Sequence, residues 1–227
     1  MAGVLYVVAT PIGNLKDITL RALETLKSVD RIVAEDTRVT AKLLARYEIR
    51  KPMFSLHARS SERAVQKVLE LVADGEAIAF VTDAGTPGIS DPGAYLVEKV
   101  RARAGEKSIV PIPGPSAVSA ALSVSGMNAD EFVFFGFPPH KKGRQKVLDE
   151  VARTARTAVL YESPHRAAKL LGELAARVPE RRLVIAREMT KMFEEIAVGA
   201  VEELRGRFME EKISGKGEFV LILGPVK

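Results

Sequence analysis

The chain contains 227 residues, which is enough for one large domain or two small ones with a buried core. It has no cysteine, which excludes disulfides, thiolate metal sites and a cysteine nucleophile and is typical of a reducing compartment such as the cytoplasm. Its three histidines are not at ligand spacing, so we expect no metal, and the net charge of +5 permits binding to phosphates without requiring it. No apolar run is long enough to span a bilayer and the N-terminus lacks a basic leader, so we expect neither a membrane segment nor a signal peptide.

Short apolar strands alternate with amphipathic helices in the first half of the sequence. In the segment 62–73, for example, apolar residues recur at the spacing of one buried helix face. This alternation with short connections predicts a mostly parallel sheet covered by helices. The predicted strands are Val4–Ala9, Arg31–Ala34, Met53–Leu56, Ala77–Val81 and Ser108–Pro111. The predicted helices are Ile18–Ser28, Thr40–Tyr47, Glu62–Ala73 and Ala94–Ala104.

A proline-rich stretch interrupts this pattern in the middle of the chain. Three prolines within Pro111–Pro115 cannot continue a strand or a helix interior. We therefore predict a first domain over residues 1–115 and a second over residues 116–227. Ser116 can cap the helix that we expect at Ala117–Ser125.

The second half predicts another α/β domain, with a mixed sheet. Two consecutive strands there are joined by a short link, which indicates an antiparallel pair. The predicted strands are Glu131–Gly136, Thr157–Tyr161, Leu183–Ala186, Glu194–Val198 and Glu218–Leu223. The predicted helices are Gly143–Ala155, Pro164–Arg177 and Val201–Lys212.

Most of the prolines follow a predicted strand directly, which is where open α/β sheets bind their ligands. The loop after the first strand, Ala9–Leu15, is neither a G-x-G-x-x-G nor a Walker motif, so dinucleotide and triphosphate binding lack support. The loop Glu35–Arg38 offers two carboxylates and a guanidinium, either as a base and a phosphate clamp or simply as a helix cap. Single loops of this kind are usually ordinary turns, but several at one sheet edge favour a ligand site.

The segment Thr82–Gly93 is the most informative of these loops. Its twelve residues include three glycines, two prolines and two aspartates, which suits a backbone that a ligand approaches closely. We expect the next helix to begin at Asp91 or Pro92 and its N-terminus to favour a carboxylate-bearing ligand.

Seven motifs together resemble those of the ribosomal RNA small-subunit methyltransferase I family, 2′-O-methyltransferases within the tetrapyrrole methylases. They occur in family order from about Leu5 to Leu223, and seven in order are specific where one would be weak. The motifs are Ala9–Leu15, Glu35–Arg38, Asp83–Gly93, Pro113–Ala117, Tyr161–Arg166, Ala186–Lys191 and Lys216–Leu223.

This resemblance implies two α/β domains with S-adenosylmethionine in the cleft between them, and usually a homodimer. It also implies ribosomal RNA or the small ribosomal subunit as partner, and a cytidine ribose in that RNA as acceptor. By position, the residues that the resemblance assigns to the methyl donor are Pro11, Asp83, Ala84, Gly85, Thr86, Ile89, Gly114, Ser116, Ala117, Tyr161 and Glu162. Residues Arg187–Lys191 would lie near the cleft.

Methyl transfer to a hydroxyl needs alignment and removal of a proton. The candidate proton acceptors are Asp36, Glu35 and, less favoured, Lys191. A carboxylate of ordinary pKa is a weak base towards an alcohol, so we expect positioning to matter more than deprotonation. The candidate RNA contacts are Arg38, His57, Lys141, Lys142, Arg144 and Lys146, although residues 141–146 are equally well explained as a solvated loop and helix start.

Two departures from the family pattern bear on the RNA target. Relatives usually carry His-x-His-Asn-Glu after the third strand, where this chain reads His57-Ala58-Arg59-Ser60-Ser61-Glu62. Many relatives also continue into a small helical domain where this sequence stops at Lys227. If either segment grips RNA in those proteins, we expect the target or the grip to differ here.

Two other functions remain open from the sequence. The same fold and donor can methylate a tetrapyrrole or another small molecule, although aromatic residues are only 6% and tryptophan is absent, which offers little for stacking a macrocycle. A protein of this fold can also bind RNA or assist ribosome assembly without catalysis. Calorimetry with S-adenosylmethionine separates the last alternative from the enzymes.

Overall fold

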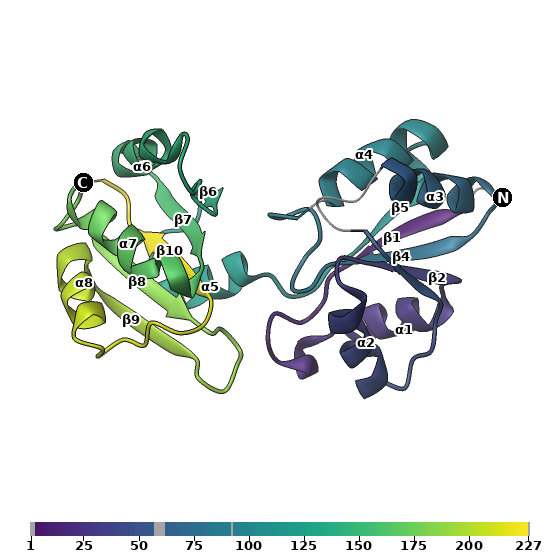
Figure 1. Ribbon diagram of the computed structural model, residues 1–227, viewed down its shortest axis with the longest axis horizontal. Helices are drawn as coiled ribbons and strands as arrows, with labels where there is room; N and C mark the ends of the chain where they lie inside the picture. The colour runs from purple at the N-terminus through teal and green to yellow at the C-terminus, as the bar shows by residue number, and fades with distance from the viewer. Residues whose placement is uncertain (1–2, 57–61, 92, 227) are drawn as a thin grey trace. The chain divides into compact units, whose positions relative to one another are not determined.

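The computed structural model describes residues 3–56, 62–91 and 93–226 of the chain. Contacts within the chain divide it into two compact units, Met1–Ser116 and Ala117–Lys227 (Figure 1). This division differs by one residue from the predicted boundary after residue 115. Each unit has its own sheet and its own hydrophobic core, and each is described by itself below.

The first unit is built on a parallel sheet, as the alternation of strands and helices predicts. Among the described residues this sheet has five strands in the order β3-β2-β4-β1-β5, and every neighbouring pair runs parallel. All carboxyl ends therefore lie at one edge of the sheet. The strands are β1 (Val4–Val8), β2 (Arg31–Ala34), β3 (Met53–Ser55), β4 (Ala77–Val81) and β5 (Ile109–Ile112).

Helices cover both faces of this sheet, because the buried strand residues are apolar on both sides. Helices α1 and α2 close one core around Leu26 and Leu44, and α3 and α4 close the other around Phe80 and Leu96 (Figure 1). The helices are α1 (Leu20–Ser28), α2 (Thr37–Arg46), α3 (Glu62–Ala73) and α4 (Gly93–Ala104), with short 3-10 turns at Leu15–Asp17 and Glu106–Ser108.

The prediction that Pro111 ends the fifth strand is wrong. Strand β5 continues through Pro111 to Ile112, which pairs with Val8 of β1. Proline is tolerated here because β5 is the last strand in the sheet order and needs hydrogen bonds on only one side. The proline-rich stretch therefore changes the chain's course only after residue 112.

The second unit has a mixed sheet, which confirms the predicted fold class. Its order is β6-β7-β10-β8-β9 in the part of the chain that the structure describes. The β6–β7 pair is parallel, whereas the three other pairs are antiparallel. The strands are β6 (Phe132–Gly136), β7 (Thr157–Glu162), β8 (Arg182–Arg187), β9 (Glu195–Ala200) and β10 (Phe219–Leu223).

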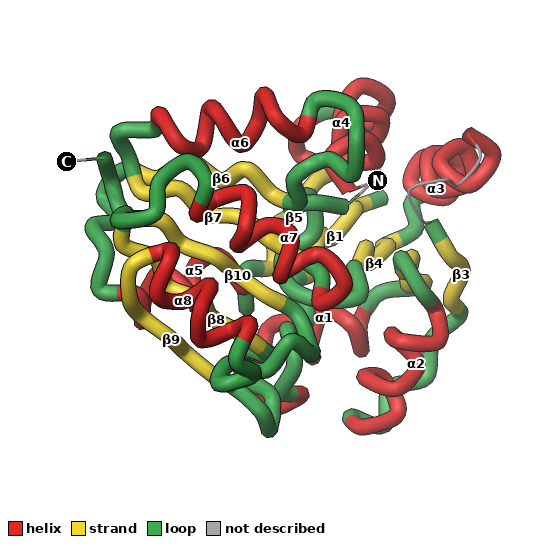
Figure 2. Tube along the Cα trace, turned by 60° about the vertical axis from the view of Figure 1, so that its left-hand side comes forward, coloured by secondary structure: helices red, strands yellow, loops and turns green. Residues whose placement is uncertain are grey.

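Three helices of the second unit bury one face of this sheet. Figure 2 shows α6, α7 and α8 lying along this sheet. Leu148 of α6, Leu170 of α7 and Leu204 of α8 belong to one core with Leu160 and Leu221 of the sheet. Helix α5 packs against β10. The helices are α5 (Ala117–Ser125), α6 (Arg144–Arg153), α7 (Pro164–Ala175) and α8 (Val201–Met209). None of the helices in the described ranges is long and apolar enough to cross a membrane.

Candidate active site

Three loops meet at the carboxyl edge of the first sheet and are joined by hydrogen bonds. The amides of Thr10 and Gly85 each donate to the other's carbonyl at 3.0 Å, which ties the loop after β1 to the loop after β4. The hydroxyl of Thr10 donates to the carbonyl of Thr82 at 3.1 Å, and the hydroxyl of Thr86 donates to the carbonyl of Pro115 at 3.0 Å. The predicted convergence of the loops after β1, β4 and β5 is therefore present within the first unit.

Close backbone packing requires small residues in these loops. Gly85 is buried with a φ of +83°, a conformation that favours glycine, and a Cβ there would lie 3.4 Å from the side chain of Ile12. A Cβ on Gly114 would lie 3.0 Å from the Cβ of Ala9. Pro11 and Pro87 are buried beside them, whereas Asp83 and Ala84 are exposed. The loops thus have a buried part, Pro11, Gly85 and Pro87, which we call the floor. They also have an exposed part, the rim, which includes Asp83 and Ala84.

A carboxylate of the chain itself organises the far end of the β4 loop. Asp91 accepts hydrogen bonds from the amides of Gly88, Ile89 and Gly93 at 2.7–3.1 Å. These amides include the first residue of α4, so Asp91 already fills the anion-binding position that the sequence predicts for a ligand carboxylate. The predicted ligand carboxylate stays a prediction, and Asp91 holds the backbone of Ile89, a residue that is 39% exposed.

Carboxylates from β2 and β4 form an acidic cluster at the same edge. The carboxylate of Asp83 accepts from the amide of Asp36 at 3.0 Å, and that of Glu35 accepts from the amide of Asp83 at 3.4 Å. Burial raises the pKa of Glu35, and repulsion from Asp83, Asp91 and Asp36 raises it further. Burial also raises the pKa of Asp83. Both carboxyl groups are therefore better proton acceptors than an ordinary surface carboxylate.

Asp36 is held in a different state from its neighbours. Its side chain caps α2 by accepting from the amide of Arg38 at 2.8 Å, and it also pairs with the Arg38 guanidinium at 2.6 Å. The hydrogen bonds from Arg38 lower the pKa of Asp36 to about 2. This low pKa makes Asp36 a weaker base than Glu35, so both predicted interpretations of this loop, the cap and the charged cluster, coexist.

Tyr161 and Glu162 lie at the end of β7 in the second unit. Burial raises the pKa of Tyr161 to about 12, so its hydroxyl stays protonated. Its ring lies 4.9 Å from that of Phe134 and 5.4 Å from that of Phe137, measured between centroids. Glu162 is only 1% exposed and pairs with Arg166 at 2.5 Å and with Arg144 at 3.7 Å. Its Oε1 atom is therefore held by Arg166 within the second unit, whereas its buried Oε2 atom accepts no hydrogen bond from the described residues.

The structure does not support Arg144 as an RNA contact. Its side chain is buried at 2% exposure and donates to Glu173 at 2.6 Å and to the carbonyl of Pro139 at 3.1 Å. A guanidinium with these partners is not free to bind a phosphate. Lys141 and Lys142, which precede it in the same loop, are exposed.

Lys191 is a poor proton acceptor for the same kind of reason. Its ammonium pairs with Glu188 and Glu218, both at 2.8 Å. Burial alone would lower the pKa of Lys191, but these two partners outweigh it and the pKa is raised. A lysine needs a lowered pKa to act as a base near neutral pH, so the structure removes Lys191 from the candidates.

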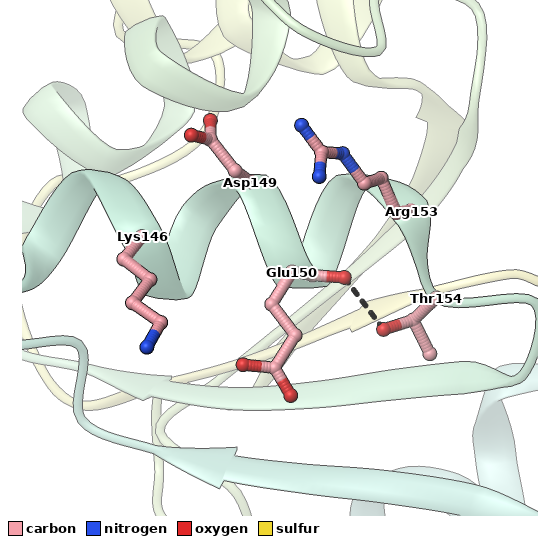
Figure 3. A pocket seen from close by; sticks show the side chains of 5 residues that line it. All are labelled: Lys146, Asp149, Glu150, Arg153 and Thr154. Atoms are coloured by element: carbon pink, nitrogen blue, oxygen red, sulfur yellow. Dashed lines mark hydrogen bonds between the residues drawn. The ribbon is translucent and has the colours of Figure 1, made fainter.

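Lys146 lines an open hollow on α6 with a volume of about 550 Å³ (Figure 3). The lining mixes two cations, Lys146 and Arg153, with the two acids Asp149 and Glu150. Thr154 completes it and donates to the Glu150 carbonyl at 2.7 Å (Figure 3). This balance of charge gives no preference for a phosphate.

A second hollow, of about 420 Å³, lies between α3 and α4 beside Tyr95 and Lys99. His57 lies outside the described residues. Within the described ranges, no three carboxylate or imidazole side chains are placed to hold a metal ion.

Comparison with known proteins identifies the family. A model of the family Tetrapyrrole (Corrin/Porphyrin) Methylases matches residues 4–205. The chain belongs to the tetrapyrrole methylase family. This result confirms the resemblance that the seven motifs predict.

Relatives of this tetrapyrrole methylase carry the name ribosomal RNA small subunit methyltransferase I. The protein of that name from Neisseria meningitidis serogroup B is 46% identical, and the match covers 100% of this chain and 78% of that protein. The one from Thermotoga maritima is 44% identical, with 97% and 98% covered. The one from Bacillus subtilis is 43% identical, with 97% and 75% covered.

Solved structures of other proteins share the fold. The crystal structure of uroporphyrin-III-C-methyltransferase from Thermus thermophilus matches with a TM-score of 0.68 at 20% identity, covering 99% of this chain and 94% of that one. The crystal structure of diphthine synthase matches with a TM-score of 0.73 at 15% identity, covering 98% and 90%. At these identities the likeness concerns the fold alone.

Two residues of the site region escaped the sequence analysis as functional groups. The sequence predicts Asp91 only as the start of a helix, although an aspartate in a turn commonly accepts hydrogen bonds from backbone amides two residues away. Phe137 follows β6 directly and is 51% exposed, which its position next to two prolines could have indicated.

Proposed function

We propose that this protein is an S-adenosylmethionine-dependent methyltransferase that methylates the ribose 2′-hydroxyl of a cytidine in small-subunit ribosomal RNA. The observation that carries the proposal is the run of relatives named ribosomal RNA small subunit methyltransferase I, 43–48% identical over at least 96% of this chain. The joined loops of the first unit and the cluster around Glu35 support it, because the reaction needs a donor site beside a proton acceptor.

The loops after β1, β4 and β5 would hold the methyl donor. They fit it because Gly85 has a backbone conformation that favours glycine, because Gly114 leaves little room for a Cβ beside Ala9, and because Asp83, Ala84 and Ile89 are exposed at this edge. The buried hydroxyl of Thr82 has no hydrogen-bond partner among the described residues, so it is available to a polar group of a bound molecule. From the second unit, Tyr161 would contribute its ring and protonated hydroxyl. Bound S-adenosylmethionine would supply an activated methyl group.

Glu35 is the proton acceptor in this proposal. Its raised pKa comes from burial and from neighbouring acids, so a proton leaving the ribose hydroxyl would relieve like-charge repulsion there. Asp36 and Arg38 would orient the substrate instead, because their mutual ion pair keeps Asp36 ionised and leaves the Arg38 side chain 86% exposed towards solvent. The carboxylate of Asp83 accepts from the amide of Asp36, which connects the proton acceptor Glu35 to the residues that would orient the substrate.

The acceptor would be an unpaired nucleotide, since a duplex hides its ribose and the 2′-hydroxyl distinguishes RNA from DNA. Exposed cations of the second unit at Lys141 and Lys142 would bind phosphates. We place this activity in the cytoplasm, with ribosomal RNA or the small subunit as partner.

We further propose a homodimer. Support comes from β9, the last strand in the order of the second sheet, where Ile196 is 38% and Val198 is 42% exposed. Phe193 and Met192 in the preceding loop are 68% and 90% exposed. An apolar edge of this kind is normally covered by another chain. Sedimentation of the purified protein tests this directly.

The proposed reaction is tested by incubating the protein with radiolabelled S-adenosylmethionine and small-subunit ribosomal RNA, followed by nuclease digestion. We expect the label in 2′-O-methylcytidine. Label in a base, or in another nucleoside, would contradict the proposed acceptor while keeping the methyltransferase. Absence of both transfer and heat on titration with S-adenosylmethionine would favour a non-catalytic RNA-binding protein.

A further inference from the structure

The segment between β6 and α6 presents an exposed aromatic ring beside exposed cations. Phe137, its first residue, is 51% exposed, and His140, Lys141 and Lys142 that follow are exposed as well. No acidic residue occurs from Phe137 to Leu148. This loop therefore offers an apolar ring and positive charge together, with no carboxylate of its own.

Two arginines, Arg144 and Arg166, hold the backbone of this loop through hydrogen bonds to its carbonyls. Arg166 donates to the carbonyl of Pro138 at 3.0 Å, and Arg144 donates to that of Pro139 at 3.1 Å. The two arginines are themselves held by the buried carboxylate of Glu162. Two successive prolines restrict the backbone further. Arg144 and Glu162 are buried, the side chains of Arg166 and Glu173 are each 15% exposed, and these four charged groups together hold the loop beneath its exposed side chains.

The ring of Phe137 is also positioned from one side. Its centroid lies 5.4 Å from that of Tyr161, with the two planes inclined at 59°. Tyr161 in turn packs edge-on against Phe134 at 4.9 Å. The ring of Phe137 therefore packs on one side against Tyr161, and about half of the residue is exposed to solvent. A fixed, half-exposed ring loses little conformational entropy when a flat group stacks on it.

We propose that the segment Phe137–Lys142 is the surface that grips single-stranded RNA, with Phe137 stacking on an unpaired base and Lys141 and Lys142 pairing with the adjacent phosphates. The inference rests on the proposed RNA substrate and adds the contact surface and its mode of binding. An aromatic platform beside cations is the general solution for single-stranded nucleic acid, because every base has a π-face and every nucleotide a phosphate. In this proposal Arg144 and Arg166 hold the loop in shape before RNA binds and do not contact the RNA.

The test measures binding of fluorescein-labelled oligocytidylate by fluorescence polarisation, over a series of salt concentrations. Phe137→Ala should weaken binding roughly 5-fold to 150-fold, the range that loss of one base stack produces, whereas Phe137→Tyr should retain it. The matched control is Phe132→Ala, because Phe132 is similarly exposed, at 43%, but lies at the start of β6. That control should bind like the wild type.

The lysines are tested by the salt dependence. The slope of log affinity against log salt is negative, and replacing both Lys141 and Lys142 with glutamine should make it shallower by about 0.7 for each phosphate that the variant no longer neutralises. Lys27→Gln, at an exposed lysine on α1, is the matched control and should leave the slope unchanged. Thermal melting checks that each variant is folded.

Titration with S-adenosylmethionine separates this inference from the proposed function. We expect Phe137→Ala to bind the donor as the wild type does. If Phe137→Ala weakens donor binding and leaves oligocytidylate binding unchanged, the ring belongs to the donor site and the inference is wrong. If the wild type transfers methyl to ribosomal RNA and Phe137→Ala binds RNA normally, the inference fails while the function stands. If the wild type neither transfers methyl nor binds RNA, the function fails as well.

Discussion

Charged side chains gather at a strand end in each unit, and the two clusters are built in different ways. In the first unit, Glu35 is partly buried and Asp83 is exposed, and both accept hydrogen bonds from backbone amides and have raised pKa values. In the second unit, Glu162 is fully buried but lies between Arg144 and Arg166. The first cluster leaves negative charge uncompensated, whereas the second balances it with guanidinium groups.

This difference separates a reactive cluster from a supporting one. Uncompensated carboxylates cost stability and are typical of sites that move protons, since their pKa values lie closer to neutrality. Paired buried charges hold a shape, and breaking one pair leaves the other charge stranded. We therefore assign chemistry to the edge of the first sheet and support of a binding loop to the end of β7.

The sharpest test of this contrast is Glu35→Gln. Loss of a general base should lower kcat about 10²-fold to 10⁴-fold and leave donor affinity unchanged. Because the pKa of Glu35 is raised in the fold, its ionisation weakens the fold as pH rises above the value in the unfolded chain. The variant should consequently be more stable than the wild type at neutral pH. Single-turnover kinetics and urea unfolding measure the two effects, and a fully active or destabilised variant would contradict the assignment.

Arg144→Met, in the second cluster, should lower the stability of the fold, whereas Glu35→Gln should raise it. It leaves Glu162 and Glu173 short of a buried cation, which typically costs about 3–5 kcal/mol of unfolding free energy. The control Arg156→Met breaks an exposed pair with Glu131 and should cost about 1 kcal/mol or less. Urea unfolding followed by circular dichroism compares them. Equal stabilities for the two variants would mean that the second cluster supports nothing.

Gly85→Ala probes the rigid floor of the first unit. A non-glycine residue at a φ of +83° costs about 1–2 kcal/mol, and here the added methyl also faces Ile12. Gly105→Ala is the matched control, because Gly105 has a φ of +86° and no atom within 4 Å of the added Cβ. Both variants should lose similar stability. Only Gly85→Ala should lose affinity for S-adenosylmethionine by calorimetry, and equal affinity in both would remove Gly85 from the donor site.

The smallest effect is expected for Asp36→Asn. Asparagine caps a helix about as well as aspartate, so only the ion pair with Arg38 is lost and the melting temperature at neutral pH should fall slightly. The pKa of Asp36 in the fold is about 2, below its ordinary value of 3.8. Its charge therefore stabilises the fold above that ordinary value, and the contribution disappears as pH falls towards 2. Melting temperatures of the two proteins should converge over this range, and a constant difference would show that Arg38 does not act through the ionised carboxylate.

Much of this architecture could be predicted because its signals are local. Strands such as Arg31–Ala34 and Ala77–Val81 are short apolar runs bounded by turn residues, and the structure has them at the same residues. The glycines and prolines after β1 and β4 marked the loops that the hydrogen bonds of Thr10 and Thr86 join. Parallel strands bring such loops to one edge whatever the details of packing.

The buried charges could not be read in the same way, because their partners come from distant segments. Arg144 sits among lysines and glycine, a pattern typical of a solvated loop. It nevertheless lies four residues before Leu148 and seven before Val151, on the buried face of α6, and this spacing could have indicated its burial. Glu162 likewise continues the alternation of Ala158 and Leu160 along β7. The burial that raises the pKa of Glu35 depends on residues that only the folded chain brings together.

The predicted cleft between the two domains, with the donor in it, stays a prediction, as do the homodimer and the ribose specificity. Of the three, the ribose specificity bears most directly on the central claim. Mapping of ribose methylation in the small-subunit ribosomal RNA of cells that lack this protein tests it. We predict that a single cytidine loses its 2′-O-methyl group and regains it when the wild-type protein, but not Glu35→Gln, is restored. An unchanged methylation map would contradict the proposed function.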